Sequence, residues 1–280
     1  MNERFGVSIF GWLVPDPSTM YAITMLVCLI VFVRRAKVAR LSQSHALAAA
    51  IWAMIGGLIG ARVFFLLQHP GWVIARPGII FSVSGGTASW GAYLGGIMGF
   101  WGYLASRREA TLPYLDVIAS LLGLGPFLAR WSCFLNGDDF GTLSGLPWAV
   151  AYPHGSIPFA HQAQQGLINP LADLSLPLHP NQLYLSLNGL FLFFLFTFIW
   201  KRYRLAPGVL FCLYWAVYSF NRFFLEFFRG SSPREYLSIL SFPQVMTLVI
   251  FAAAVSGIVF LRRSRQSFEA VKAAATDGLE

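Results

Sequence analysis

Residues 207–229 read PGVLFCLYWAVYSFNRFFLEFFR, and this stretch decides the class of fold. Its apolar run is long enough to cross the hydrocarbon core of a bilayer as a helix, which takes about 20 residues. Tyr218, Arg222 and Glu226 interrupt the run at intervals of four, so they share one helix face, and Arg229 follows on the same side. Because charge is costly at membrane depth, this face must point into a helical bundle and away from lipid.

The composition of the whole chain is that of a membrane protein. Of the 280 residues, 56% are hydrophobic and only 11% are charged, whereas soluble domains carry about 25% charged residues. Seven segments qualify approximately as transmembrane helices, namely 19–34, 46–67, 86–106, 112–134, 181–200, 207–227 and 240–261. We therefore expect an all-α, polytopic membrane protein of about seven transmembrane helices, with residues 1–280 forming a single membrane domain.

The basic residues predict the orientation of the chain. Thirteen of the 20 Lys and Arg residues lie in four short runs, at 34–40, 107–108, 201–204 and 262–272. The positive-inside bias assigns such runs to the cytoplasm, which places the N-terminus outside and the C-terminus in the cytoplasm. The same bias accounts for the net charge of +8, so nucleic acid is not expected as a partner.

Three cysteines, Cys28, Cys133 and Cys212, lie in apolar segments without the spacing of a metal site. This pattern predicts neither a disulfide framework nor a zinc site, and we expect no metal or other cofactor. The longest connection, 135–180, is rich in Gly, Pro, His and Gln and lies on the predicted outer face. Loops of this length are usually functional or disordered. The aromatic and proline residues within it favour a small folded cap.

Three further segments place polar or small residues near helix ends. Residues 123–141 join Arg130 to a polar turn, residues 179–184 read HPNQLY, and residues 84–96 read SGGTASWGAYLGG. Arginine presents a planar fork of donors that matches phosphate. Taken singly, residues 123–141 are explained as a helix-ending turn and residues 179–184 as the start of a helix. Residues 84–96 are explained as a close contact between helices. Arg222 and Glu226 likewise suit either a structural ion pair or a cationic pocket for an anionic headgroup.

In their order and spacing, these segments resemble the prolipoprotein diacylglyceryl transferase family from about Tyr21 to Arg229. The matching pieces are Tyr21, Gly60-Ala-Arg62-Val, Gly85-Gly86, Asp116 ahead of Arg130, Arg130 with Asn136-Gly137 and Gly141, His179-Pro-x-Gln182-Leu-Tyr184, and Tyr218-x3-Arg222-x3-Glu226-Phe-Phe-Arg229. No single piece is decisive, and the resemblance rests on all of them together.

The resemblance implies an enzyme of the bacterial cytoplasmic membrane. Such an enzyme transfers diacylglycerol from phosphatidylglycerol to the lipobox cysteine of a prolipoprotein signal peptide, forming a thioether and releasing glycerol phosphate. It implies that Arg130 and Arg222 stabilise the leaving phosphate, that Glu226 orients Arg222, and that Tyr218 belongs to the catalytic group. The implied substrate-binding residues are Tyr21, Arg62, Asn136, Asp138, Gly141, His179, Gln182 and Arg229. Membrane lipid is a further implied partner.

The chain departs from the family pattern at two residues to which activity is attributed. Trp90 stands where the family usually has His, and Cys133 stands where it has Asn. Tryptophan cannot accept a proton at neutral pH, so any role of that His as a base is absent here. Cys133 beside Arg130 is a candidate nucleophile, although a buried cysteine is more often a small hydrophobe.

Three classes of function remain open on the sequence. In the first, the arginine pocket suffices for transfer, with Tyr21, Tyr218 or Asp138 assisting. In the second, the chain is a divergent paralogue that binds anionic lipid without this transfer, or that uses a different acceptor. The third class is a transporter. Intramembrane charge alone suggests it, and the lack of a recognisable internal repeat argues against it.

Overall fold

The computed structural model describes residues 7–9, 12–14, 17–75, 77–78, 86, 88–231 and 240–277. The chain divides into two compact units. The first unit takes Met1–Cys28 and Ile118–Glu280, and the second takes Leu29–Val117. Helices α1 (Pro17–Val38) and α5 (Thr111–Leu121) each contribute residues to both units.

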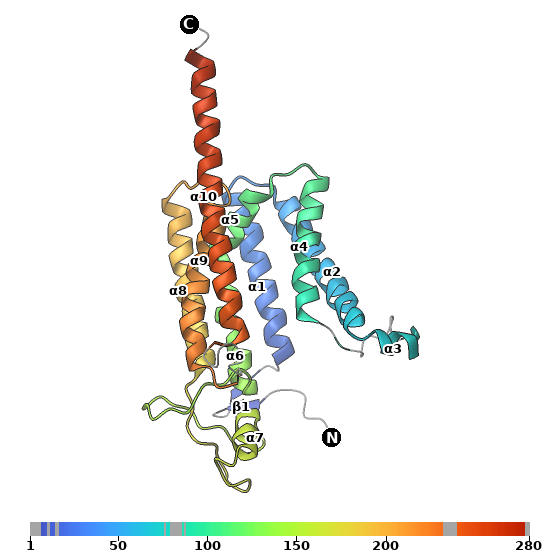
Figure 1. The fold of residues 1–280 in the computed structure, drawn as a ribbon, viewed down its shortest axis with the longest axis vertical. Helices are drawn as coiled ribbons and strands as arrows, with labels where there is room; N and C mark the ends of the chain where they lie inside the picture. Colours follow the sequence, from blue (N-terminus) through green and yellow to red (C-terminus); the bar gives the residue numbers. More distant parts are fainter. Residues whose placement is uncertain are drawn as a thin grey trace. The chain divides into compact units, whose positions relative to one another are not determined.

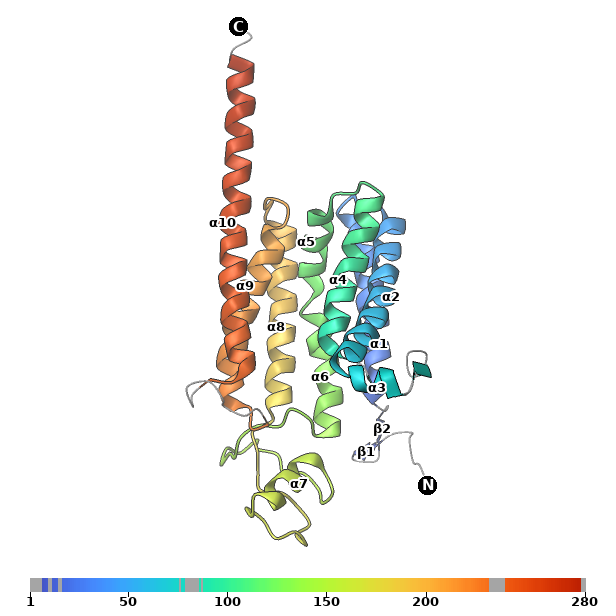
Figure 2. The same cartoon turned by 45° about the vertical axis from the view of Figure 1, so that its right-hand side comes forward.

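The first unit is a bundle of long apolar helices. Its members are α6 (Leu124–Asn136), α8 (Asn181–Arg202), α9 (Val209–Leu225) with the short 3-10 helix η2 (Glu226–Phe228), and α10 (Phe242–Asp277). Helix α8 packs against α6 and α9, and α10 packs along α9 (Figure 1). Leu192, Phe196 and Tyr214 are buried where α8 meets α9. Helix α10 extends well past the ends of α8 and α9 (Figure 2).

Two short strands are an exception to the helical structure of the described residues. β1 (Val7–Ile9) and β2 (Trp12–Val14) form an antiparallel hairpin ahead of α1. A hairpin of this size buries little surface and does not change the class of fold.

A bend interrupts the predicted segment 112–134. Helices α5 and α6 meet there at 46°. Glycine and proline are the usual causes of such bends, and the sequence supplies Gly123, Gly125 and Pro126 at this point. A Cβ atom on Gly123 would lie 2.3 Å from the carbonyl oxygen of Gly189, so this glycine also permits the close approach of α6 to α8.

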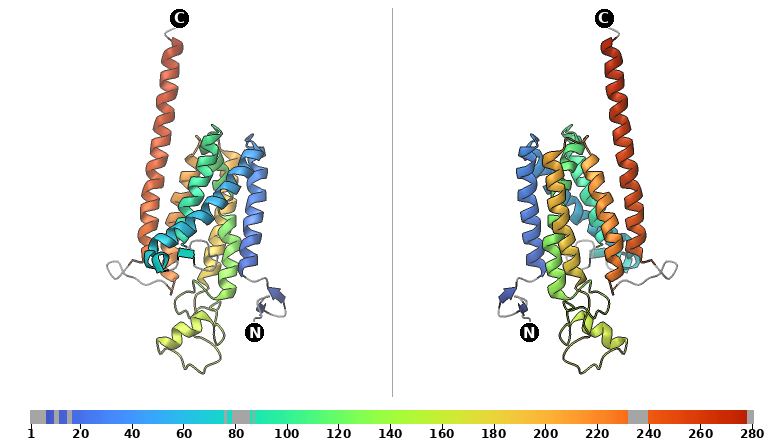
Figure 3. Two further views of the ribbon diagram at one scale, coloured as in Figure 1. Left: turned by 90° about the vertical axis from the view of Figure 1, so that its right-hand side faces the viewer. Right: turned by 90° about the vertical axis from the view of Figure 1, so that its left-hand side faces the viewer.

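Residues 137–180 form a folded segment at one end of α6 and α8 (Figure 3). Isolated bridges pair Leu143 and Val150 with Leu178. Ser156 is the N-cap of α7 (Ile157–Gln164), and its hydroxyl accepts a hydrogen bond from the Phe159 amide at 3.4 Å. Phe140, Tyr152 and Leu178 form a small buried cluster. This segment corresponds to the predicted cap, and its placement on the outer face of a membrane stays a prediction.

The second unit contains α2 (Gln43–Gln68), α3 (Pro70–Ala75) and α4 (Ser89–Ser106). Glycines line the contact between α2 and α4, as the small-residue pattern predicted. A Cβ atom on Gly95 would lie 2.0 Å from the carbonyl oxygen of Gly56, and one on Gly91 would lie 2.1 Å from that of Gly60. The two backbones therefore pack directly on each other. Ser84, Gly85 and the side chain of Trp90 lie outside the described residues.

All seven predicted segments are helical over most of their length. By length and apolarity, four helices of the described chain qualify as membrane spans, and a fifth is added when α5 and α6 count as one bent span. The protein is thus a multi-pass membrane protein. The count of seven spans stays a prediction.

The α2–α4 contact leads to a test with two adjacent glycines. Replacing Gly95 with Ala inserts a methyl group at 2.0 Å from backbone, whereas in Gly96→Ala the nearest atom is at 3.4 Å. Alanine favours a helix over glycine by about 1 kcal/mol at either position, and overpacking costs about 1–3 kcal/mol. We expect Gly95→Ala to lower the thermal stability of the purified protein in detergent and Gly96→Ala to leave it unchanged or raise it. Equal effects would contradict the close backbone contact.

Candidate functional site

The charged face of α9 lies inside the bundle. Arg222 is 7% exposed and Glu226 is 3% exposed, and an Arg222 guanidinium nitrogen lies 2.5 Å from the Glu226 carboxylate. Ser241 also donates a hydrogen bond to this carboxylate, at 3.4 Å. The four-residue spacing therefore does produce an ion pair on one helix face, as the sequence predicted.

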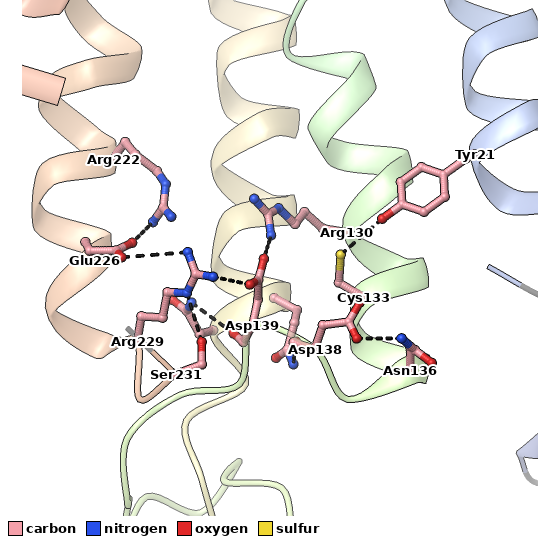
Figure 4. A network of polar contacts seen from close by, with 12 residues as sticks. Tyr21, Arg130, Cys133, Asn136, Asp138, Asp139, Arg222, Glu226, Arg229 and Ser231 are labelled. Atoms are coloured by element: carbon pink, nitrogen blue, oxygen red, sulfur yellow. Dashed lines mark hydrogen bonds and ion pairs between the residues drawn. The ribbon is translucent and has the colours of Figure 1, made fainter. Parts of the chain in front are cut away.

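Asp139 connects this pair to the residues of α6. One carboxylate oxygen of Asp139 pairs with Arg130 and the other pairs with Arg229 (Figure 4). Arg229 in turn lies 3.7 Å from Glu226. The result is a continuous chain of alternating charges, which we call the arginine network and which consists of Arg130, Asp139, Arg229, Glu226 and Arg222.

The arginine network carries an excess of positive charge. Its three guanidinium groups face two carboxylates, and the charges of Arg130 and Arg229 both act on Arg222. Arg222 and Arg130 extend toward each other from α9 and α6 (Figure 4). Like charges repel, so this arrangement favours an additional anion beside the guanidinium groups. Such a site suits a phosphate or another oxyanion.

A strained turn places Asp139 at the centre of the network. Gly137 ends α6 in the left-handed conformation with φ of 79°, and Asp139 itself has φ of 53°. Side chains at the start of α8 hold the turn from the other side. Gln182 donates to the carbonyl oxygen of Asp138 at 2.6 Å and Asn181 donates to that of Asp139 at 3.3 Å. Sequence reasoning missed Asp139 because Asp138 occupies the family position, and only the adjacent pair of acids hinted at it.

Gly141 joins the cap to the end of η2. It forms an antiparallel bridge with Arg229, flanked by hydrogen bonds from the Thr142 amide to the Phe228 carbonyl at 2.9 Å and from the Gly230 amide to the Phe140 carbonyl at 3.0 Å. A Cβ atom on Gly141 would lie 2.3 Å from the His179 carbonyl oxygen. The glycine is therefore required by close packing, and it fixes the backbone of Arg229.

The predicted residues His179 and Gln182 support the cap. The His179 ring lies 3.1 Å from the Tyr184 hydroxyl, which accepts a hydrogen bond from the Trp148 indole at 2.8 Å. Gln182 is fully buried and hydrogen-bonds the Tyr152 hydroxyl as well as the Asp138 carbonyl. The structure thus places both side chains in contact with the cap and outside the ion pairs.

Tyr21 and Cys133 meet beside the network. The Tyr21 hydroxyl lies 3.5 Å from the Cys133 sulfur, and Cys133 is one helix turn after Arg130. Asn136 donates to the Asp138 carboxylate at 2.5 Å. Burial raises the pKa of the Asp138 carboxyl, since it disfavours the charged form, and the hydrogen bond from Asn136 lowers that pKa in part.

Two further predicted residues lie elsewhere. Tyr218 stacks on Tyr214, with ring centroids 6.0 Å apart. Arg62 belongs to the second unit, where it donates to the Gly86 carbonyl oxygen at 2.8 Å. Its part in a site with the other arginines stays a prediction.

No metal centre accompanies these residues in the part of the chain that the structure describes, where no three His, Cys, Asp or Glu side chains are grouped to hold an ion. All three cysteines are free thiols. The groups that the site offers include guanidinium, carboxylate, hydroxyl and thiol groups.

These features define a multi-pass membrane protein with a partly buried network of ion-paired arginines at the end of its helical bundle. A family model of prolipoprotein diacylglyceryl transferases matches residues 13–260. The chain belongs to this family.

Relatives across several bacterial lineages are similar to the chain, and each of the three described here is named phosphatidylglycerol–prolipoprotein diacylglyceryl transferase. The protein of Clostridium tetani is 28% identical, with 88% of this chain and 90% of the relative covered. That of Thermotoga maritima is 27% identical over 94% of this chain and 86% of the relative. The Frankia casuarinae protein is 31% identical over 80% of this chain, which spans 54% of that longer relative.

Two neighbouring acids test the arrangement of the network. Asp139→Asn removes the negative charge between Arg130 and Arg229, whereas Asp138→Asn alters a carboxylate whose only described side-chain hydrogen bond is to Asn136. Charge-assisted hydrogen bonds contribute about 1.5–3 kcal/mol each. We expect Asp139→Asn to lower the unfolding temperature in detergent clearly and Asp138→Asn to change it little. A larger loss in Asp138→Asn would contradict the central position of Asp139.

Proposed function

We propose that the chain transfers the diacylglyceryl group of phosphatidylglycerol to the lipobox cysteine of prolipoproteins in the bacterial cytoplasmic membrane. The observation that carries the proposal is the arginine network, three guanidinium groups on two carboxylates at the end of an apolar bundle. Membership of the family and the names of the relatives support the same activity.

The charge of the network matches the charge of the donor lipid. A phosphatidylglycerol headgroup bears one negative charge, and the network has one positive charge in excess. As the glyceryl carbon–oxygen bond breaks, a second negative charge develops on the leaving phosphate. Arg130 and Arg222 are the groups assigned to it, because fixed donors stabilise developing charge without the reorganisation that water needs. Glu226 holds Arg222, and Asp139 holds Arg130 in the same way.

The reaction forms one bond and breaks another at the same carbon. The thiolate of the lipobox cysteine attacks the glyceryl carbon that bears the phosphate, the carbon–oxygen bond breaks, and glycerol phosphate leaves with the electron pair. The thiol must first lose its proton, since the thiolate is the nucleophile. Asp138 is the strongest candidate acceptor, because burial raises the pKa of its carboxyl and makes it more basic than an ordinary aspartate. Tyr21 and Tyr218 are the other candidates.

The remaining predicted residues take positioning or binding roles in this proposal. Asn136 orients the Asp138 carboxylate, and Gly141, His179 and Gln182 fix the turn and the cap. Lipid enters sideways between helices, and the signal peptide approaches from the outer face near residues 135–180. This arrangement requires the N-terminus outside and the C-terminus in the cytoplasm, which the four basic runs favour.

The main test uses a lipobox peptide, phosphatidylglycerol and purified protein. We expect mass spectrometry to detect a diacylglyceryl increment on the peptide cysteine with the unaltered chain. Arg130→Ala and Arg222→Ala should each lower the rate by about 10²–10³-fold or more, as the loss of one oxyanion donor does. Arg204→Ala, in a predicted cytoplasmic loop, is the matched control and should be fully active. Normal turnover in both site variants would refute the assignment.

A second candidate function follows from Trp90 and Cys133, which stand where the resemblance leads us to expect His and Asn. In this function the chain binds anionic lipid in the network without transfer to a lipobox peptide, or transfers to another acceptor. Release of glycerol phosphate separates these functions: a lipid-binding paralogue releases none, and a transferase with another acceptor releases it only when that acceptor is present. A transporter would instead move lipid across the bilayer without breaking it.

Cys133 itself provides a further prediction. Its side chain is 8% exposed and contacts Tyr21, which suits a packing residue better than a nucleophile that must reach the lipid. Cys133→Ala should therefore retain turnover within about tenfold. A loss as large as that of Arg130→Ala, measured on the same peptide, would identify Cys133 as a participant in the reaction.

A further inference from the structure

A groove of about 380 Å³ lies along the contact of α2 and α4, separate from the arginine network. It is open and mostly apolar, and Figure 2 shows the two helices that flank it side by side. The residues that form its walls are Trp52 on α2 and Met98, Gly99, Gly102, Tyr103, Ser106 and Arg107 on α4 and its C-cap.

Glycines create the space within the groove. Gly99 lies directly on the α2 backbone, where a Cβ atom would be 2.2 Å from the Trp52 carbonyl oxygen. Gly102, one turn further along α4, has no atom within 4 Å of its Cβ position. Gly99 therefore brings the helices together, while Gly102 leaves open space in the groove that Trp52 and Tyr103 also line.

The groove has a fixed polar end. Arg107 lies over the ring of Tyr103, with 5.7 Å from its guanidinium carbon to the ring centroid. The Tyr103 hydroxyl lies 3.0 Å from the His45 ring, and this hydrogen bond helps to fix the Tyr103 side chain. The nearby carboxylate of Glu109 pairs with His45 at 3.6 Å and accepts a hydrogen bond from Tyr114 at 3.3 Å. Glu109 is thus engaged by His45 and Tyr114, and Arg107 is the charged residue that lines the groove.

The dimensions suit part of a lipid. Gly99 and Arg107 are eight residues apart on α4, which corresponds to about 12 Å along a helix. This length is close to the depth of one leaflet of hydrocarbon, about half of the ~30 Å core. Basic groups at the cytoplasmic ends of transmembrane helices attract anionic headgroups, and the sequence places Arg107 and Arg108 at such an end.

We propose that this groove binds an anionic phospholipid of the cytoplasmic leaflet, with one acyl chain beside Gly102 and the headgroup phosphate on Arg107. The site is distinct from the proposed catalytic site, because every wall residue belongs to the second unit and none belongs to the arginine network. Its occupant is a resident lipid that fills the gap between α2 and α4, and no bond is made or broken there.

Native mass spectrometry of the protein in detergent with dioleoyl-phosphatidylglycerol tests this site. Gly102→Leu fills the channel and Arg107→Gln removes the charge, and we expect each variant to retain one fewer tightly bound lipid than the unaltered chain. Arg108→Gln removes the same charge from a residue outside the groove and should retain the full number. Arg130→Ala should also keep this molecule, which separates the site from the catalytic lipid.

Several outcomes would overturn the proposal. Equal lipid retention by the unaltered chain and Arg107→Gln would exclude a role for the groove in headgroup binding, even if Gly102→Leu fails to fold. Equal loss of bound lipid in Arg107→Gln and Arg108→Gln would indicate only a general attraction of anionic lipid to basic residues. Equal retention of dioleoyl-phosphatidylcholine would exclude selection of an anion, and a dimer disrupted by Gly102→Leu without loss of lipid would assign the groove to a second copy of this chain.

Discussion

The cost of charge at membrane depth is the constraint on which this structure depends. An unpaired arginine among the phenylalanines of α9 would cost several kcal/mol, so Arg222 requires a partner, and Glu226 on the next turn supplies it. Glu226 is less exposed than Arg222 and is shared with Arg229, which Asp139 in turn connects to Arg130. Each ion pair thus compensates one charge and positions the next charged side chain of the network.

The cap and the network depend on each other through the backbone. Asn181 and Gln182 at the start of α8 hold the turn that carries Asp139, and Gly141 bridges this turn to Arg229. A loop between two helices therefore sets the distance between α6 and α9 at the level of the arginines. Rigid support of this kind is what an oxyanion site requires, because small displacements of a catalytic group lower rates strongly.

The sequence predicted the helical segments from the length of their apolar runs, and it predicted the charged face of α9 from the four-residue spacing of its polar residues. The density of small residues at 84–96 predicted a close helix contact there, and the structure identifies α2 as the partner of α4. The role of Asp139 could not be predicted, since it depends on a left-handed turn and on side chains of α8 that lie more than 40 residues away. The bend between α5 and α6 was also missed, because Gly and Pro are tolerated in straight membrane spans too.

The central claim is that the arginine network binds the phosphate of a donor lipid. The most direct measurement is an electron cryo-microscopy structure of the protein in nanodiscs that contain phosphatidylglycerol. We expect density for a headgroup phosphate within hydrogen-bonding distance of both Arg130 and Arg222, with Asp139 still paired to Arg229. A structure in which lipid phosphate occupies the membrane domain elsewhere, while these guanidinium groups contact only their carboxylates, would contradict it.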